Sequence, residues 1–444
     1  MIFNDNPQCS SYLSKLPTGW TWTVLDSLVD HNRGICYGIV QPGSHHADGV
    51  PMVNTGDVFD GHVNKLVSFK VAQSIHQKFK RSTLKGGELL ITLVGANFGR
   101  VAIAPHTYAG FNCSRAVGVV PVNVDAQYVM FALRSPISRR FMDDHANTTA
   151  QPTFNLKDVA AIPIPLPPES ERRRISEFLV DLDDRIALLR ETNTTLESIA
   201  QAMFKSWFMD FDPVRAKQEG REPEGMEADT AALFPDSFEE SELGLVPKGW
   251  RIDSIYAAAQ VIYGAPFASS KFNSEGVGKP LIRIRDLKGE TPRVFTQEVH
   301  PKGYLVKPGD IVVGMDGEFR AYLWGGEDAW LNQRVCVFTP SSEFPPAFVH
   351  RSIIPILAAV EASETATTVI HLGKNDIDRF RILVPDGEVL SAFGEITGPI
   401  YNKIVEQKQM ARTLCGLRDT LLPRLISGQL RLPEAEALVE EAAA

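Results

Sequence analysis

The sequence predicts a mixed α/β (α+β) fold, in which two tandem α/β domains are separated by two long antiparallel helices that form a coiled coil. Two observations carry this prediction: a long amphipathic stretch in the middle of the chain, and the recurrence of the segments around it in the second half of the chain. A helix whose apolar stripe is too long for its own domain needs a partner helix. The recurrence places that partner near the end of the same chain.

The long amphipathic stretch runs from Glu169 to Met209. Its apolar residues alternate in steps of four and three, which is the heptad spacing of a coiled-coil seam, and only Asn193 is polar at its turn. At about 1.5 Å per residue such a helix is roughly 60 Å long, more than an ordinary globular domain covers. The predicted seam consists of Ile175, Leu179, Leu182, Ile186, Leu189, Leu196, Ala200 and Met203.

The second helix follows from an internal repeat. Adding 218 to the seam positions gives a weaker seam, and the same offset relates residues 154–167 to residues 372–385. Matched segments at a fixed spacing indicate two copies of one structural unit. The second seam consists of Phe393, Thr397, Ile400, Ile404, Gln407, Ala411, Leu414, Arg418 and Leu421, supported by Leu417 and Leu425.

Each copy opens on the same phrase, an apolar residue and Pro followed by Gly and Trp, so Trp20 and Trp250 are predicted to be buried structural residues. Short β-type segments punctuated by Gly, Pro, Asn and Asp follow in both copies. The offset between matched positions falls from 230 near the start of the copies to 218 near their end. The matched segments are 50–63 with 279–292, 86–104 with 308–324, and 112–120 with 332–338.

These patterns divide the chain into seven parts. They are an N-terminal tail (1–15), a first α/β domain (16–168), a central long helix (169–210), an acidic linker (211–245), a second α/β domain (246–388), a C-terminal long helix (389–428) and an acidic tail (429–444). For the linker, two alternatives stay open: a segment packed at a few apolar points such as LFPDSF, or a disordered spacer.

Charge is distributed unevenly along the chain. The net charge is −9 over 444 residues, but residues 217–242 carry −7 and residues 429–444 carry −3, which leaves +1 for the rest. A neutral body can still present bases to phosphates on one face, so the composition permits DNA binding without proving it.

Composition also indicates the compartment. The chain is 44% hydrophobic and 22% charged, which suits two or three globular domains with proper cores. It lacks an apolar run as long as a membrane helix needs, a signal-peptide pattern and any CxxC pair among its five cysteines. We therefore expect a cytoplasmic protein with neither a disulfide framework nor a membrane span.

A search for catalytic motifs finds none. The chain has no Asn/Asp-Pro-Pro-aromatic motif of an amino methyltransferase, no phosphate loop, no HExxH and no GxSxG. A nuclease centre of Glu275, Asp286 and Lys288 is a chance-level pattern, and His45 with His46 is more typical of a solvated loop than of a metal site. We expect no metal site and no catalytic residues in this chain.

Four features resemble the specificity subunit of type I restriction-modification systems: the two-copy layout, the PTGW and PKGW openings, FNLKDVAAIPIPLPPESERRRI before the long helix, and KSWFMDFDPVRAKQEGREPEGM with LFPDSFEESELGLVPKGW after it. The resemblance covers about residues 16 to 430. It implies two target recognition domains in a pseudo-twofold arrangement, each reading one half of a bipartite site in double-stranded DNA.

The resemblance also implies the partners. They are two modification subunits, which methylate adenine with S-adenosylmethionine, and two restriction subunits, which use ATP and Mg. This chain would bind none of these cofactors and would not be an enzyme itself. A two-headed scaffold for other proteins is the alternative function, and a stand-alone nuclease is a remote third.

Base reading needs bidentate donors, such as Arg to guanine or Asn and Gln to adenine, on loops that can enter a groove. Arg283 and Arg285 are included because they alternate with Ile282 and Ile284 on an expected strand, so both would face one side. The candidates are Asn97, Arg100, Asn112, Arg115, Arg283, Arg285, Arg320, Asn332, Gln333 and Arg334.

The first long helix ends in an apolar cluster that is a candidate subunit interface. An alternative for Met203 and Phe204 is that they fill the intramolecular coil. The interface candidates are Leu196, Met203, Phe204, Trp207 and Phe208.

Overall fold

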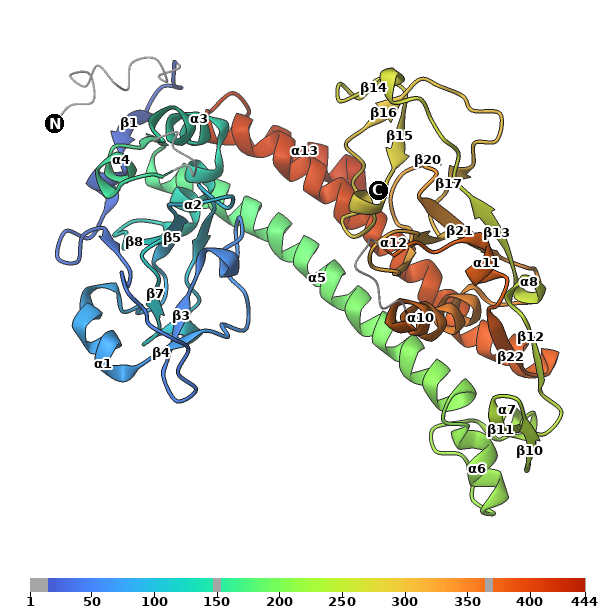
Figure 1. The fold of residues 1–444 in the computed structure, drawn as a ribbon. Helices are drawn as coiled ribbons and strands as arrows, with labels where there is room; N and C mark the ends of the chain where they lie inside the picture. The colour runs from blue at the N-terminus through green and yellow to red at the C-terminus, as the bar shows by residue number, and fades with distance from the viewer. Residues whose placement is uncertain (1–14, 147–152, 364–369, 444) are drawn as a thin grey trace. The chain divides into compact units, whose positions relative to one another are not determined.

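The computed structural model describes residues 15–146, 153–363 and 370–443. The chain forms two compact units (Figure 1): unit 1 is Met1–Arg185 with Leu414–Ala444, and unit 2 is Ile186–Thr413. Each unit holds one repeat copy and parts of both long helices. The tail expected at 1–15 lies outside the described residues, apart from Lys15.

Short strands carry the first copy: β1 (Thr21–Val24), β2 (Cys36–Tyr37), β3 (Val50–Val53), β4 (Lys70–Val71), β5 (Leu89–Thr92), β6 (Val101–Ile103), β7 (Asn112–Cys113), β8 (Val117–Val120) and β9 (Pro163–Leu166). Strands β5 and β8 are buried at every residue and lie at the centre of a sheet of order β2-β8-β5-β6. A second sheet has the order β4-β3-β7, with β3 and β7 parallel. Strands β1 and β9 pair antiparallel.

Helical segments connect the strands of the first copy: η3 (Leu25–Leu28), η4 (Thr55–Asp57), α1 (Gln73–His76), η5 (Gln77–Ser82), η6 (His106–Tyr108), α2 (Ala126–Arg134), α3 (Pro136–His145) and α4 (Leu156–Ala160). Helix α2 packs against β6 and β9. The Asp125 side chain caps α2 by accepting the N–H groups of Gln127 and Tyr128. Pro136 begins α3 because proline suits the first turn of a helix.

The second copy has a matching set of strands: β12 (Arg251–Ser254), β13 (Ala259–Tyr263), β14 (Phe272–Asn273), β15 (Lys279–Ile282), β16 (Phe295–Thr296), β17 (Leu305–Val306), β18 (Ile311–Gly314), β19 (Ala321–Leu323), β20 (Ala329–Leu331), β21 (Val335–Pro340) and β22 (Arg381–Val384). They form sheets of order β13-β21-β18-β19 and β14-β16-β15-β20-β17, and β12 pairs antiparallel with β22. The four-stranded sheet and the terminal pair repeat the first copy, as does the parallel pair β15 and β20.

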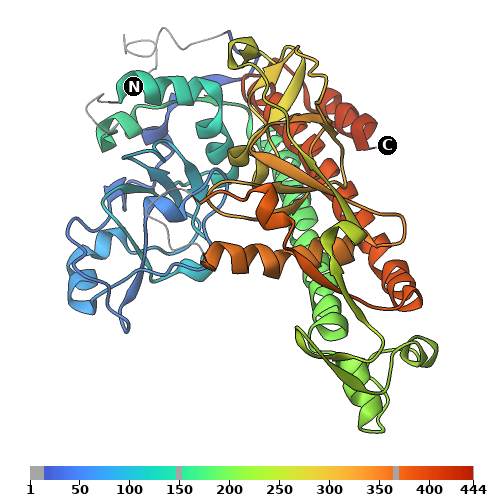
Figure 2. The ribbon, with the colours of Figure 1, turned by 45° about the vertical axis from the view of Figure 1, so that its right-hand side comes forward.

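The helical segments of the second copy are α8 (Ile255–Ala258), η7 (Ser269–Lys271), α9 (Ile284–Leu287), α10 (Pro346–Ser363) and α11 (Lys374–Ile377). Helix α10 lies against β19 and β21 (Figure 2). It corresponds to α2 and α3 of the first copy, but it continues through Pro355 where the first copy breaks before Pro136.

Both opening phrases fold into the same turn. The amide of Trp20 donates to the Pro17 carbonyl, and the amide of Trp250 donates to the Pro247 carbonyl, each at 3.1 Å. The intervening glycine has a φ of +88° in the first copy and +86° in the second, a value that this turn type reserves for glycine. Both tryptophans are buried, which confirms their predicted structural role.

The two long helices are α5 (Glu169–Phe208) and α12 (Gly387–Ile426), each 40 residues long. Their first residues are 218 positions apart, which is the offset of the repeat. Within unit 2, Asn193 contacts Ile404 and Phe204 contacts Phe393, so the partner number falls as the residue number rises. The helices therefore run antiparallel, and the predicted fold class is confirmed.

Every residue of both predicted seams is buried or half-buried. Two polar members of the seams form specific contacts, although Asn193 Oδ1 and Gln407 Oε1 are buried without a hydrogen-bond partner in the described part of the chain. The Thr397 hydroxyl donates to the Phe393 carbonyl at 2.7 Å, and Asn193 Nδ2 donates to the Ile404 carbonyl at 3.2 Å. Polar groups inside a coiled-coil seam favour one register because any other leaves them unpaired.

The acidic linker is packed, which settles the two alternatives that its composition left open. It contains α6 (Asp212–Gln218), α7 (Ala228–Ala232), β10 (Phe238–Ser241) and β11 (Gly244–Pro247). Phe234, from the LFPDSF phrase, is 2% exposed, and its ring lies 5.1 Å from that of Trp207. The Lys217 ammonium donates to the Ala231 carbonyl at 3.2 Å and also to that of Phe234, which joins α6 to the end of α7.

The acidic tail contains helix α13 (Leu432–Ala443), which belongs to unit 1. Its residues Leu432, Ala435 and Val439 are buried. Beside it, Arg431 forms an ion pair with Glu171 of α5 at 3.2 Å. The end of the chain thus packs on the start of the first long helix.

Candidate nucleic-acid interface

A hairpin in each copy presents the first group of candidate residues. Strands β5 and β6 pair antiparallel around Gly95–Gly99, and β18 and β19 pair antiparallel around Gly317. The φ values of +87° at Gly95 and +76° at Gly317 mark the same point of the turn in both copies.

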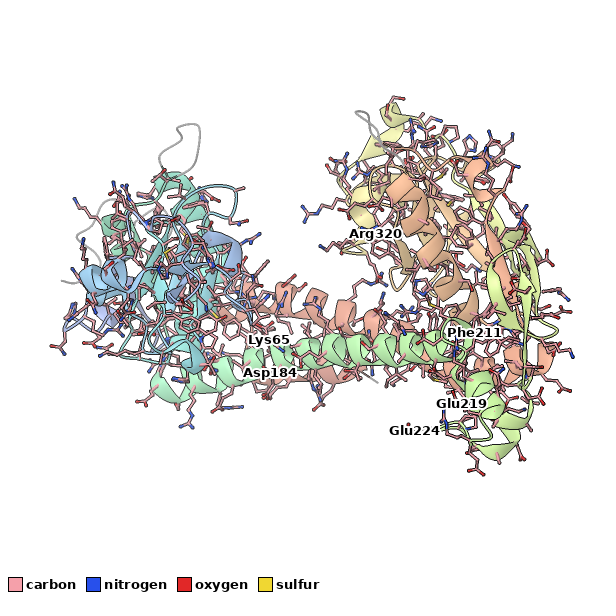
Figure 3. All side chains as sticks on the ribbon, turned by 60° about the horizontal axis from the view of Figure 1, so that its bottom comes forward. Lys65, Asp184, Phe211, Glu219, Glu224 and Arg320 are labelled. Carbon is pink, nitrogen blue, oxygen red and sulfur yellow. The ribbon has the colours of Figure 1, made fainter. Side chains whose placement is uncertain are left out.

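The arginine that follows each hairpin is held differently in the two copies. Arg100 is half-buried: its Nη1 donates to the Val58 carbonyl at 3.3 Å, and its guanidinium lies 5.2 Å from the Phe59 ring centroid. Arg320 lies at the surface of unit 2 (Figure 3), with 47% of its side chain exposed, and forms an ion pair with Glu361 at 2.7 Å. The hydrogen bond from Arg320 lowers the pKa of the Glu361 carboxyl.

Asn97 lies on the same hairpin as Arg100. Its Nδ2 donates to the Thr55 carbonyl at 3.4 Å, which is a long hydrogen bond, and the residue is half-buried. A weak contact of this kind can be exchanged for a contact with a ligand. Asn97 stays a candidate.

The structure overturns the choice of Asn112. This residue is fully buried in β7, where its side-chain oxygen accepts from the Ser82 hydroxyl at 2.7 Å and from the Cys113 amide at 2.8 Å. Its Nδ2 donates to the Phe79 carbonyl at 3.2 Å. The polar atoms of Asn112 are occupied inside the fold and do not face a ligand.

The structure fixes the register of the matched segments 112–120 and 332–338. Parallel bridges pair Ile39 with Ser114 in the first copy and Ala265 with Asn332 in the second. Asn332 is therefore the equivalent of Ser114. It is half-buried at the edge of this bridge, so its backbone has a structural role in both copies.

The exposed candidates follow this bridge directly. Arg115 in the first copy and Gln333 and Arg334 in the second copy are exposed. Arg334 Nη1 lies 3.3 Å from Asp316 Oδ1, and 54% of its side chain is exposed. These three residues lie on loops that precede β8 and β21, and they stay candidates.

Arg283 and Arg285 do not share a strand. Strand β15 ends at Ile282, and Arg283 is the residue before the single helical turn α9. The Asp286 carboxylate accepts from both the backbone amide and the Nε of Arg283, which closes this turn. The alternation of Arg with Ile predicts a strand here, but the carboxylate three residues after Arg283 caps a helical turn instead. Arg285 is exposed on α9.

The residues of the weak nuclease pattern do not form a common site. Asp286 is 5% exposed and serves Arg283, whereas Glu275 is exposed and bonds the backbone and hydroxyl of Ser274. His45 Nδ1 accepts from the Lys70 amide at 3.2 Å. Across residues 15–146, 153–363 and 370–443, no group of three or more His, Cys, Asp or Glu side chains is placed to hold a metal ion.

Comparisons with known proteins agree with this architecture. The family description "Type I restriction modification DNA specificity domain" matches residues 45–198. The HindI specificity subunit of Haemophilus influenzae is 24% identical over 86% of this chain and 94% of its own length. The EcoBI specificity subunit of Escherichia coli is 33% identical over 43% of this chain and 36% of its own length.

A solved structure shows the same fold. The crystal structure of the type I restriction-modification S subunit from M. genitalium aligns with a TM-score of 0.53, at 17% identity, over 93% of this chain and 98% of that chain. Over most of its length the chain is similar to type I restriction-modification specificity subunits. Within the residues that the structure describes, none of the helices combines the length and the apolar character that a membrane span requires.

The interface expected at the end of α5 is not a free surface in this chain. Phe204, Trp207 and Phe208 are 5 to 7% exposed and belong to the core of unit 2. The Phe208 ring lies 4.9 Å from that of Phe393 on α12. Leu196 and Met203 are partly buried against the same core. The alternative, in which Met203 and Phe204 fill the intramolecular coil, is the one that the structure has.

Two polar residues of the candidate interface were missed by sequence reasoning. Asp316 follows β18, and His371 lies beyond α10, yet the two form an antiparallel bridge beside Arg334. The repeat offset of 218 relates His371 to Thr153, so an alignment of the copies contained the signal. Nothing local in the sequence links His371 to Asp316, which lies 55 residues earlier.

Proposed function

We propose that this chain is the DNA sequence-recognition subunit of a type I restriction-modification complex, and that each repeat copy reads one half of a bipartite site. The observation that carries the proposal is that the two copies share a backbone frame and present different polar side chains on it. Arg100 and Arg320 hold the same place after equivalent hairpins in different surroundings. Two similar domains with different reading surfaces suit two different half-sites.

Charge and geometry support a DNA target. Base edges in the major groove are read by Arg, Asn and Gln, and residues of these types stand on the loops before β8 and β21. The acidic excess lies in residues 217–242 and 429–444, so the remaining chain, at +1, is not repelled by phosphates. A protein with an internal repeat also suits duplex DNA, where half-sites recur about one helical turn apart.

The proposal includes a division of labour. Two modification subunits would methylate adenine with S-adenosylmethionine, and two restriction subunits would use ATP and Mg, while this chain binds none of these cofactors and performs no catalysis. Support comes from the similarity of the chain to type I specificity subunits. Purified alone, the chain should bind duplex DNA but transfer no methyl group. Adenine methylation by the chain alone would contradict the proposal.

Domain exchange tests the assignment of half-sites. Residues 16–150 are replaced by the corresponding residues of another specificity subunit, and methylated adenines are mapped in cells that carry the exchanged chain and its partner subunits. We expect one half of the methylated site to change and the other to stay. The matched control exchanges residues 246–365 and should change the opposite half.

Two outcomes would contradict the proposal. A change in both halves after one exchange, with folding preserved, would show that the copies do not read DNA independently. A pattern that is the same with and without the chain would favour the alternative of a protein scaffold without a DNA-reading role.

A further inference from the structure

A small backbone frame lies behind the hairpin of the first copy. The Leu93 amide donates to the Ala116 carbonyl at 2.8 Å, and the Phe154 amide donates to the Leu93 carbonyl at 2.9 Å. Next to it, Val94 forms an antiparallel bridge with Thr153. The frame brings three neighbouring positions together, and in this copy they carry the short side chains of Val94, Ala116 and Thr153.

The second copy repeats this frame bond for bond. The Met315 amide donates to the Arg334 carbonyl at 3.0 Å, and the Leu372 amide donates to the Met315 carbonyl at 2.7 Å. Asp316 forms the antiparallel bridge with His371. The three positions that carry Val, Ala and Thr in the first copy therefore carry Asp, Arg and His in the second. We call Asp316, Arg334 and His371 the polar triad.

The geometry of the polar triad assigns its protons. His371 Nδ1 lies 2.6 Å from Asp316 Oδ1 and 3.5 Å from Arg334 Nη1. Arginine only donates, so Nδ1 cannot accept from Arg334 while it donates to Asp316. The shorter contact decides: Nδ1 carries the proton and donates to the carboxylate. Nε2 is then the nitrogen that accepts a hydrogen bond when the ring is in its neutral form.

Asp316 orients His371 and Arg334 and leaves other hydrogen-bonding groups of both side chains available. Its Oδ1 accepts from both His371 and Arg334, at 2.6 Å and 3.3 Å. The contact with Arg334 involves one of the five N–H donors of the guanidinium. More than half of the Arg334 side chain is exposed. An arginine held in this way is oriented in advance and can still present a pair of donors to a ligand.

Fold stability does not account for the polar triad. The first copy forms the same frame with the same hydrogen bonds although Val94, Ala116 and Thr153 cannot form an ion pair there. Ion pairs with exposed partners contribute little to stability. The frame is thus independent of the side chains that it displays, which is what a scaffold with a variable reading surface requires.

We propose that the polar triad determines the base preference of the second recognition domain at one position of its half-site, with Arg334 as the base-contacting residue and Asp316 as its positioning residue. The proposal rests on the proposed DNA-reading function. Guanine is the expected base, because its N7 and O6 accept the paired donors of an arginine. His371 adds an acceptor, Nε2, for a neighbouring donor on a base.

The test measures base preference with the full chain. Four proteins are each allowed to select sequences from a library of duplex DNA in which the bases of the half-site are randomised. They are the wild-type chain, Arg334→Ala, Asp316→Asn and the matched first-copy variant Val94→Ala. In Arg334→Ala, we expect discrimination to fall about 5- to 150-fold at one position of the second half-site, the range that one bidentate base contact provides. The first half-site should be unchanged.

The Asp316→Asn variant separates positioning from charge. This variant keeps Arg334 but weakens the acceptor that orients the guanidinium. The preference for one base over the others should therefore become smaller at the same position of the half-site. The dependence of affinity on salt should stay as in the wild type because no phosphate contact is lost. Val94→Ala should leave the second half-site unaffected.

Each other outcome has a defined meaning. A uniform loss of affinity in Arg334→Ala, with base preference kept and a smaller salt dependence, would show a phosphate contact and overturn the proposal. Unchanged binding of a folded Arg334→Ala chain would overturn it as well. A wild-type chain that enriches no bipartite sequence would instead overturn the proposed function. Thermal unfolding of each variant verifies that it is folded. The variant Arg334→Lys keeps the charge but not the paired donors, so it should still lose discrimination between bases.

Discussion

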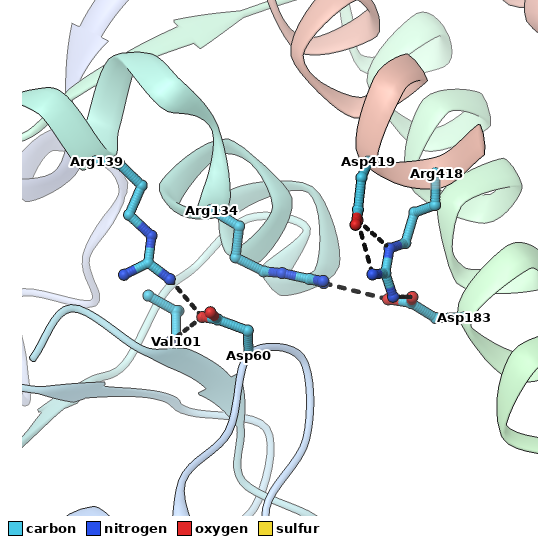
Figure 4. A network of polar contacts seen from close by, with 7 residues as sticks. All are labelled: Asp60, Val101, Arg134, Arg139, Asp183, Arg418 and Asp419. Carbon is cyan, nitrogen blue, oxygen red and sulfur yellow. Dashed lines mark hydrogen bonds and ion pairs between the residues drawn. The ribbon is translucent and has the colours of Figure 1, made fainter. Parts of the chain in front are cut away.

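Each recognition domain is joined to the long helices by a polar contact, and the two contacts use different chemistry. In unit 1, Asp183 of α5 accepts from Arg134 of α2 at 3.1 Å and from Arg418 of α12 at 2.7 Å (Figure 4). In unit 2, the residue equivalent to Asp183 is Tyr401 of α12, and its hydroxyl lies 2.9 Å from Nδ1 of His350 on α10.

The first contact, which we call the ionic anchor, joins two cations to one carboxylate. The side chains of Arg134 and Arg418 are 8% and 18% exposed, and that of Asp183 is 25% exposed. Arg418 also binds Asp419 at 2.7 Å, so its charge is compensated twice. Largely buried charges destabilise the fold when one of them loses its partner.

The second contact, which we call the neutral anchor, contains no full charge. His350 is buried, its Nε2 lies 3.2 Å from the Ala321 carbonyl, and a carbonyl can only accept. Nε2 therefore carries the proton, and Nδ1 accepts from the Tyr401 hydroxyl. Burial lowers the pKa of His350 from 6.5 to about 4 and raises that of Tyr401 to about 12.

The comparison shows that one repeat position can hold either a charge or a neutral phenol as long as its partner changes with it. The anchors should therefore respond to different perturbations. Loss of one charge should break the ionic anchor, whereas acid should break the neutral anchor.

The largest effect is expected when the ionic anchor loses its carboxylate. Asp183→Ala leaves Arg134 and Arg418 facing each other without their shared anion, which costs about 3 kcal/mol for a buried pair. Thermal unfolding of the chain and hydrogen exchange in unit 1 would measure it. Asp184→Ala is the matched control, because Asp184 is the exposed neighbour on the same helix (Figure 3). Equal destabilisation by the two variants would show that the anchor contributes nothing specific.

Acid should weaken the neutral anchor. The pKa of His350 is about 4 in the folded chain and 6.5 when unfolded, so between these values the unfolded chain binds a proton that the folded chain excludes. Stability is therefore fully present above pH 6.5 and is lost as the pH falls towards 4. At pH 5 the loss is about 2 kcal/mol, at 1.36 kcal/mol per pH unit.

Hydrogen exchange of α10 between pH 7 and pH 5, corrected for intrinsic exchange rates, would measure this loss. A His350→Phe variant should be less stable at pH 7, because it leaves Tyr401 without its acceptor, but it should lose this part of the pH dependence. The same pH dependence in wild type and variant would rule out His350 as its source.

The two opening tryptophans provide a smaller contrast. Trp20 Nε1 donates to Glu171 at 2.9 Å, whereas Trp250 Nε1 is buried with no hydrogen-bond partner in the described part of the chain. The repeat places Val389 where the first copy has Glu171. Replacing each tryptophan by phenylalanine should therefore cost about 1 kcal/mol more at Trp20, where a hydrogen bond is lost as well as ring volume. Chemical denaturation of both variants would measure the difference, and a larger cost at Trp250 would contradict it.

The smallest effect concerns a side contact of the neutral anchor. Arg351 donates to the Glu197 carbonyl at 3.0 Å and to the Gln201 side chain at 3.4 Å. Gln201 is exposed and the contact is long, so Gln201→Ala should change stability by less than about 0.5 kcal/mol. The same denaturation experiment checks this value. A larger loss would mean that the side-chain contact, rather than the carbonyl, holds Arg351.

The sequence by itself determined the repeat, the two long helices and the buried opening tryptophans. The seam from Ile175 to Met203 and its recurrence at an offset of 218 were readable because helix periodicity is local: each apolar residue reports on neighbours three and four positions away.

Only the tertiary structure decided which polar residues are available to a ligand. The side chain of Asn112 is hydrogen-bonded to Ser82 and Phe79. Arg283 precedes a helical turn capped by Asp286 and does not lie on the expected strand. These contacts bridge 3 to 33 residues. The sequence shows which residues carry hydrogen-bond donors, but not which of these donors form hydrogen bonds within the fold.

The two groups that matter most to the proposals were decided in the same way. Phe204 and Trp207 form a core with Phe393, which belongs to the other long helix, so an apolar helix end that resembled an interface is interior. Asp316 meets His371 only because the sheet register brings two distant loops together. Register depends on pairing between strands that are far apart in sequence, and a shift of one residue would reverse which side chains face outwards.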